Sequence, residues 1–202
     1  MKLLEPKEEL PRSSEGGFSI AELVVVIGMI MVLSAVAIIN ISSSLKAAAA
    51  DTASQLIVQE MRLARQYAIS DRKIYRLTFN SPSGIALDRQ NADGTFTPMS
   101  ISIIPQTVAF QCESGIPTTS ATTPNGIGVG TVPIDFGVGD SIQIFFQPDG
   151  AGRDSLGRIA NGVVYTSISG KLSSARAVTL FGSTGSIKSW KLLNVNGTWT
   201  WQ

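Results

Sequence analysis

The stretch Gly16-Gly17-Phe18-Ser19-Ile20-Ala21-Glu22 stands directly before an apolar run, residues 23–45, that contains no charged residue. The run reads LVVVIGMIMVLSAVAIINISSSL. About twenty apolar residues in a helix cover about 30 Å, which is the thickness of the hydrocarbon region of a bilayer. A helix in a soluble core is rarely apolar on every face for that length. The sequence therefore predicts a membrane segment that extends from Leu23 to about Ile41.

Two details separate this segment from a secretory signal. A secretory signal places its small-residue cleavage site after a short apolar core, whereas Gly16 and Gly17 precede the run. Cleavage after Gly17 would leave the apolar helix on the mature protein, beginning at Phe18. The second detail is Glu22, because an ionisable side chain in a membrane costs up to about 3 kcal/mol and generally has a partner. The free α-amino group of Phe18, on the same or a neighbouring chain, would be a suitable cation.

These residues resemble the type III signal of type IV pilins and pseudopilins, in which a hydrophilic leader is followed by Gly, Phe, a Glu four residues later and a long apolar helix. Gly17, Phe18 and Glu22 occupy those positions. The resemblance implies cleavage after Gly17 by a prepilin peptidase and N-methylation of Phe18. It also implies that the apolar helix packs in a filament core and that Glu22 pairs with the N-terminal amine of an adjacent subunit. The alternative is a single-pass anchor in which Glu22 is incidental.

Composition limits the other classes of function. The formal net charge of the whole chain is +1, which argues against a general nucleic-acid binder but does not exclude a local basic patch. The chain has no histidine, so it lacks the commonest general base and a common metal ligand. The single cysteine, Cys112, cannot form an intramolecular disulfide, which departs from the many type IV pilins that close a C-terminal loop with two cysteines. We expect Cys112 to be a small buried apolar residue.

We expect the chain to divide into a hydrophilic leader, residues 1–17, an apolar helix, residues 18–45, and a globular domain, residues 46–202. The resemblance implies that the helix is transmembrane or in a filament core and that the globular domain is periplasmic. The helix is expected to continue to about residue 70, because apolar residues recur after Lys46 at spacings of three and four. These residues are Ala53, Leu56, Ile57, Leu63, Ala64, Tyr67 and Ala68. Such a stripe predicts packing on a β-sheet. The predicted fold is therefore α+β, with a long N-terminal helix on an antiparallel β domain, and the resemblance implies that this fold is pilin-like.

Short apolar runs separated by Gly, Pro, Asn and Asp predict strands over residues 74–202. The expected strands are 74–80, 85–89, 99–104, 108–111, 141–147, 163–169, 177–181, 186–193 and 198–201. Asn196-Gly197 predicts a type I′ hairpin between the last two. Residues 113–140 are rich in Gly, Pro, Ser and Thr and are expected to form a long loop with a surface specific to this chain.

The second half of the chain resembles the GspH/FimT type of minor pilins and pseudopilins, in which a Phe-x-Pro-x-Gly turn precedes the last strands. Phe146-Gln147-Pro148-Asp149-Gly150 fits that turn. DNA-binding members of this type carry Gly-Arg-x-Arg near the last strands, where this chain has Gly185-Ser186-Ile187-Lys188. Both arginines are therefore missing. Lys171, Arg176, Lys188 and Lys191 are the remaining candidate DNA contacts, and a solvated strand face is the alternative reading.

Other chemistry is weakly supported. Asp149, Gly150, Gly152, Asp154 and Ser155 offer oxygen ligands of the kind that Ca²⁺ takes, but their spacing fits no standard loop, and Pro-Asp-Gly is an ordinary turn. We therefore predict no metal and no cofactor. No phosphate loop, zinc spacing or Gly-x-Ser-x-Gly motif is present, so we do not expect an enzyme.

We interpret the sequence as a minor pilin or pseudopilin of a type IV pilus or a type II secretion system. The expected partners are other pilins, a prepilin peptidase, an assembly platform in the bacterial inner membrane, and membrane lipid before assembly. The C-terminal domain would lie in the periplasm, and the assembled filament would be periplasmic or extracellular. The alternative is a DNA-binding competence pilin of the FimT type.

Overall fold

The computed structural model describes residues 17, 19–117, 123–127, 131–137 and 141–202, with the backbone alone for residues 36–40, 43 and 125. The predicted leader, Phe18 and parts of the predicted loop 113–140 lie outside the described residues. The chain forms two compact units, Met1–Ser42 and Ser43–Gln202. The domain limits drawn from the sequence remain a prediction.

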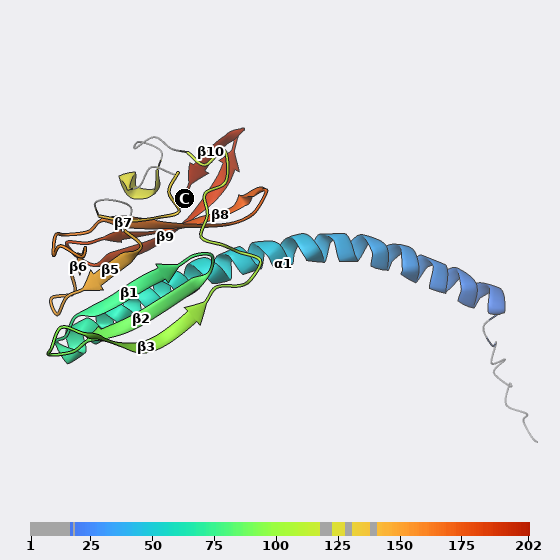
Figure 1. Cartoon of the computed structure of the whole chain (residues 1–202). Helices are drawn as coiled ribbons and strands as arrows, with labels where there is room; N and C mark the ends of the chain where they lie inside the picture. Colours follow the sequence, from blue (N-terminus) through green and yellow to red (C-terminus); the bar gives the residue numbers. More distant parts are fainter. Residues whose placement is uncertain (1–16, 18, 118–122, 128–130, 138–140) are drawn as a thin grey trace, which may run out of the picture. The chain divides into compact units, whose positions relative to one another are not determined.

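A single helix, α1, extends over Ile20–Asp71. In the unit Ser43–Gln202 it is followed by antiparallel sheets (Figure 1), which confirms an α+β fold. Within the part of the chain that the structure describes, we find no helix that combines the length and the apolar character needed to cross a membrane.

The first sheet has the strand order β3-β2-β1-β5-β6. Its strands are β1 (Tyr75–Asn80), β2 (Gly84–Gln90), β3 (Phe96–Ile103), β5 (Gln143–Phe146) and β6 (Gly152–Arg153). Strand β3 lies at the edge, and a register shift in its pairing with β2 leaves Met99 without a cross-strand partner. The Phe96 ring lies against Phe145 and 4.1 Å from the Arg76 guanidinium carbon.

The second sheet has the order β10-β9-β8-β7-β4. Its strands are β4 (Ile134–Phe136), β7 (Gly162–Ile168), β8 (Lys171–Phe181), β9 (Ser186–Val195) and β10 (Thr198–Trp201). Asn196 and Gly197 both have positive φ, at 52° and 83°, as a type I′ turn requires. They join β9 to β10 with Trp201 opposite Leu192, which confirms the predicted hairpin.

The sequence prediction differs from the structure at one predicted strand and at three short elements, and β8 begins six residues before the predicted strand 177–181. Residues 108–111 do not form a strand, because Ala109 makes only an isolated bridge to Ser167. Strands β4 and β6 were not predicted, and a 3₁₀ turn at Pro124–Gly126 falls in the expected loop. These elements have two or three residues each, which is too short for a hydrophobic period to appear.

The predicted apolar stripe of the helix forms one side of the main core. Ala53, Ile57, Ala64 and Ala68 are fully buried, and Leu56 and Leu63 are partly buried against the same cluster. Met61 also belongs to the stripe and was missed, whereas Tyr67 is 36% exposed. The stripe packs against the buried residues of both sheets: Leu77, Phe79, Leu87, Ile144, Phe146, Val164, Val178 and Leu180.

Arg65 joins the end of this helix to two turns. Its Nε donates to the Gly150 carbonyl at 3.1 Å, and its Nη2 donates to the Thr184 carbonyl at 3.2 Å. Gly150 closes the turn of the Phe-x-Pro-x-Gly stretch by donating to the Gln147 carbonyl at 2.8 Å. Gly185 lies directly against this contact, because a Cβ at Gly185 would be 2.2 Å from the Gly150 oxygen and 2.4 Å from the Arg65 Nε.

This close approach gives a stability prediction. We expect Gly185→Ala to lower the free energy of unfolding by about 3 kcal/mol, because it adds a clash with backbone to the cost of a positive φ. Gly197→Ala is the matched control: its φ is also positive, but nothing lies within 4 Å of its Cβ position, so we expect a loss of about 1 kcal/mol. Urea unfolding would measure both, and equal losses would contradict the clash.

Candidate functional site

The candidate site at the N-terminal end of α1 begins with the cap of the helix. Ser19 precedes Ile20, the first helical residue, and its carbonyl accepts the first helical hydrogen bond from Leu23 at 3.1 Å. The Ser19 hydroxyl oxygen accepts from the Ala21 N–H at 3.3 Å, and Glu22 Oε2 accepts from the Ser19 N–H at 3.0 Å. This reciprocal arrangement is a variant of the capping box, in which the cap hydroxyl accepts from the second helical N–H instead of the third. It was not predicted, although Ser-x-x-Glu is its sequence signature.

The cap defines what surrounds the predicted cleavage site. Gly17 is exposed, has no helical assignment, and has open space at its Cβ position. Phe18, the residue predicted to be N-methylated, lies outside the described residues. Glu22 is in the first turn, where a carboxylate is favoured by the helix dipole. Its second oxygen, Oε1, has no hydrogen-bond partner in the described part of the chain, so it can accept from a cation.

The helix that follows Glu22 exposes its apolar side chains on every face. All described side chains from Ser19 to Ala35 are exposed, and Ile20, Met31, Val32 and Leu33 are between 67% and 83% exposed. Exposed apolar surface of this extent marks a site of interaction with lipid or with other protein. Residues 36–40 of the predicted membrane segment have no described side chains.

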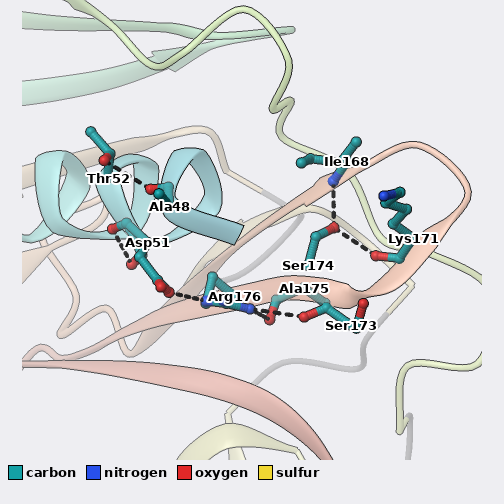
Figure 2. A network of polar contacts seen from close by, with 10 residues as sticks. Ala48, Asp51, Thr52, Ile168, Lys171, Ser173, Ser174, Ala175 and Arg176 are labelled. Carbon is teal, nitrogen blue, oxygen red and sulfur yellow. Dashed lines mark hydrogen bonds and ion pairs between the residues drawn. The ribbon is translucent and has the colours of Figure 1, made fainter. Parts of the chain in front are cut away.

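The four predicted DNA contacts do not form one surface. Arg176 is 2% exposed, and Figure 2 shows its side chain directed at α1, where its Nε donates to Asp51 Oδ1 at 2.6 Å. Its Nη1 donates to the carbonyls of Ser173 and Ala175. Arg176 is therefore committed to holding β8 against the helix and is not available to a ligand.

The three lysines are also separated. Lys188 and Lys191 are both exposed on β9, but they are an odd number of residues apart and so point to opposite faces of the sheet. Lys171 begins β8 and lies five residues, about 17 Å of extended strand, from Arg176. Arg176 is the residue opposite Lys191 in the sheet.

The oxygen-rich segment considered for calcium is occupied by its own hydrogen bonds. Asp154 is 4% exposed and accepts from the N–H groups of Leu156 and Arg158 and from the Arg158 guanidinium. Burial acts to raise the pKa of Asp154, but the hydrogen bonds from Arg158 and Leu156 outweigh it, so that the pKa is lowered. Asp149 accepts from the Ala151 N–H. Among the described residues, no group of three or more His, Cys, Asp and Glu could hold a metal ion.

Comparison with known proteins gives few relatives. No protein-family model and no curated protein matches the chain. Two solved structures of the minor pseudopilin EpsH from the type II secretion system of Vibrio cholerae are similar, with 12% sequence identity and a TM-score of 0.47. They match 70% and 72% of this chain and 96% and 94% of their own. The type IV minor pilin FimU of Pseudomonas aeruginosa has 13% identity and a TM-score of 0.42, over 73% of this chain and 89% of its own.

The ion pair in Figure 2 gives a prediction about stability. We expect Asp51→Ala to lower the free energy of unfolding by about 2 kcal/mol, because the buried Arg176 guanidinium loses its counter-charge. The loss is smaller than for a fully buried pair, because the Asp51 side chain is 45% exposed and partly screened.

The control for this prediction is the same substitution in an Arg176→Met background. There we expect Asp51→Ala to cost at most about 0.5 kcal/mol, since no buried charge remains to be neutralised. Urea unfolding of the four variants measures the coupling. Equal costs in both backgrounds would show that Asp51 acts without Arg176.

Proposed function

We propose that this protein is a minor pilin or pseudopilin, a structural subunit of a type IV pilus or a type II secretion pseudopilus. One observation carries the proposal. A Gly17–Phe18 cleavage signature is followed, one helical turn later, by Glu22, in a helix whose described first half exposes apolar side chains on all faces. Its mechanism would be assembly and not catalysis.

The geometry around Gly17 and Glu22 is compatible with this proposal. Gly17 lies outside the helix and is exposed, as a residue at a cleavage site should be. After cleavage, Phe18 would carry a free amine, which the peptidase would then methylate. Glu22 uses one carboxylate oxygen for its own cap and has the other available. A neighbouring subunit's amine could bind that oxygen without disrupting the helix start.

The proposed location follows from the same helix. Before assembly, residues 18–45 would lie in the bacterial inner membrane, with residues 46–202 in the periplasm. Extraction by the assembly platform would then exchange lipid for the apolar helices of other pilins. The contact between Glu22 and the amine would set the axial position of each subunit, because an unpaired buried charge is costly. The filament would be periplasmic or extracellular.

Cleavage and methylation can be tested directly. We expect the protein purified from membranes to have the intact mass of residues 18–202 with one added methyl group on the Phe18 amine. Gly17→Val should leave the leader attached, because a branched side chain replaces the small residue at the scissile bond. Recovery of the wild-type chain with Met1 still present would contradict the proposal.

Assembly can be tested separately with Glu22. We expect Glu22→Gln to be cleaved and inserted normally but to enter sheared filaments at least tenfold less than the wild type, because leaving one partner of a buried ion pair unpaired costs about 3–5 kcal/mol. Glu22→Asp is the matched control, since it keeps the charge and should restore part of the incorporation. Wild-type incorporation of Glu22→Gln would show that the carboxylate charge is not needed.

A further inference from the structure

Two strands at the sheet edges of the globular unit carry no charged residue. They are β3, at the edge of the first sheet, and β10, at the edge of the second. Figure 1 shows them at opposite margins of the unit. Natural proteins protect an exposed edge strand with charged side chains or proline, because its free backbone groups can pair with another strand. In β3 only Pro98 gives such protection, and it lies before the stretch 99–103.

The backbone groups of Ile101 and Ile103 face away from the first sheet. The Ile104 N–H donates to the Ser83 carbonyl at 3.0 Å, and hydrogen-bonded and non-hydrogen-bonded pairs alternate along an antiparallel ladder. The register with β2 therefore leaves Ile101 and Ile103 in non-hydrogen-bonded pairs, with their N–H and C=O groups on the free edge. Their side chains are 74% and 65% exposed. This part of β3 thus offers unpaired backbone together with apolar surface.

Strand β10 has the same arrangement. The Gln202 N–H donates to the Lys191 carbonyl at 3.0 Å, and the Lys191 N–H donates to the Gln202 carbonyl at 2.7 Å. By the same alternation, Trp199 and Trp201 lie in non-hydrogen-bonded pairs with β9, and their N–H and C=O groups are on the free edge. The free positions are two residues apart on both strands, so the two edges match in spacing.

The other two sheet edges are less suitable for pairing. Strand β6 has only two residues. Strand β4 has three, and its Phe136 N–H already donates to the Ser141 carbonyl at 3.0 Å. Among the strands that the structure describes, β3 and β10 are therefore the edges with consecutive free positions.

Strand β3 runs against the direction of α1. The hairpin that leads into β3 contains Asn91, which lines a cleft together with Arg72, just after the end of the helix. Near the other end of the strand, Ser102 donates to Glu60, twelve residues before Arg72. The strand thus returns along the helix from its C-terminal end.

Strand β10 runs with the direction of α1. In β8, Arg176 contacts Asp51 of the helix, and Thr184, which follows β8, contacts Arg65 further along the helix. Strand β8 therefore runs with α1. Strand β9 is antiparallel to β8, and β10 is antiparallel to β9. Two copies of the chain that point the same way would consequently present β3 and β10 to each other as antiparallel strands.

We propose that β3 of one subunit pairs with β10 of a second copy of this chain. The inference rests on the proposed filament role, because that role requires neighbouring subunits to point in the same direction. One antiparallel register pairs all the free positions: it places Ile101 opposite Trp201 and Ile103 opposite Trp199. Cross-strand pairs of an aromatic and a β-branched residue stabilise a sheet.

The faces of the two strands agree with this register. Ser102 reaches the helix, so its neighbours Ile101 and Ile103 point away from the helix. Trp199 and Trp201 pack on the second cluster, which lies on the side of β8 opposite the helix core. Because residues directly opposite in a ladder share a face, the exposed isoleucines would meet the tryptophans.

The contact joins two different surfaces, so it can repeat from copy to copy. Such a heterologous contact leaves one β3 and one β10 free at the ends of each assembly. Pairing of β3 with a second β3 would instead close into a dimer whose strands are antiparallel and whose helices point in opposite directions. The proposed contact therefore places copies of this chain in succession in the filament.

Disulfide crosslinking tests the contact and its register. Ser102 would be opposite Thr200 in a non-hydrogen-bonded pair, with a spacing of about 4.5 Å that suits a disulfide. We therefore expect Ser102→Cys/Thr200→Cys, in a Cys112→Ala background, to form multimers on oxidation. The matched control is Ser102→Cys/Thr198→Cys, a diagonal pair about 7–8 Å apart, which should crosslink about tenfold less. Non-reducing gels measure both in sheared filaments and, separately, with the full-length protein in detergent micelles.

A proline variant tests whether the backbone ladder holds the contact. The Ile103 N–H faces the free edge, so Ile103→Pro removes no hydrogen bond to β2. Added to the Ser102→Cys/Thr200→Cys pair, it should lower the crosslinked fraction about tenfold, whereas Ile103→Val should keep it within about twofold. Equal crosslinking of the two variants would show that no ladder forms and would overturn the proposal.

The remaining outcomes separate this inference from the filament role. Crosslinking of Ser102→Cys alone would show β3 against β3, and equal crosslinking of the two cysteine pairs would show contact without the register. Either result would overturn the proposal, as would filaments that contain the Ser102→Cys/Thr200→Cys chain without crosslinks, or no crosslinks in micelles and filaments alike. Crosslinks in micelles from a chain that does not enter filaments would support the strand pairing and count against the filament role alone.

Discussion

The structure depends on the close approach of the second half of α1 to the two sheets. Ala50, Ala53, Ala64 and Ala68 are fully buried along one side of the helix. Small side chains at these positions let the helix backbone come near the strands, so that larger residues of the sheets fill the space between them. Hydrophobic burial supplies the driving force at about 25 cal/mol per Å², but it is non-directional. It does not by itself fix how far the helix is rotated or shifted.

Polar contacts beside the stripe supply that direction. Arg176 reaches Asp51 from β8, Ser102 donates from β3 to Glu60 at 2.6 Å, and Arg65 donates to Gly150. These contacts join three different levels of the helix to three different parts of the β domain. Since none of them can form unless the alanines have already brought the elements together, they select one packing from the several that the stripe would permit.

The sequence predicted the features that have a recognisable pattern, such as the apolar stripe and the hairpin. It did not predict single side-chain contacts, which have no pattern in the sequence. The stripe is visible because its period of three and four persists over several turns. The Asn196-Gly197 hairpin is visible because few residues accept two positive φ values.

Arg176 was predicted as a candidate DNA contact, and this prediction failed for a physical reason. Residues 174–180 of β8 are buried on both faces, with the helix core on one side and a second cluster around Tyr165 and Leu192 on the other. A charged residue there looks like the exposed face of an ordinary strand until the covering layers are known.

The same limitation applies to reasoning from net charge. The formal charge of +1 argued against a general nucleic-acid binder and left open whether a local basic patch exists. Four aspartates, however, are already paired with four arginines, and the charges in those pairs largely cancel for a distant ligand. A ligand therefore interacts mainly with the charges that are left outside these pairs, which we call the remainder. The sign of the remainder varies over the surface. At the end of α1 that remainder is positive, because Arg62, Arg65, Arg72 and Lys73 carry more charge than the ionised Asp71 among them can offset. A balanced composition is therefore compatible with a local site, and the pairing of each charge decides where that site can be.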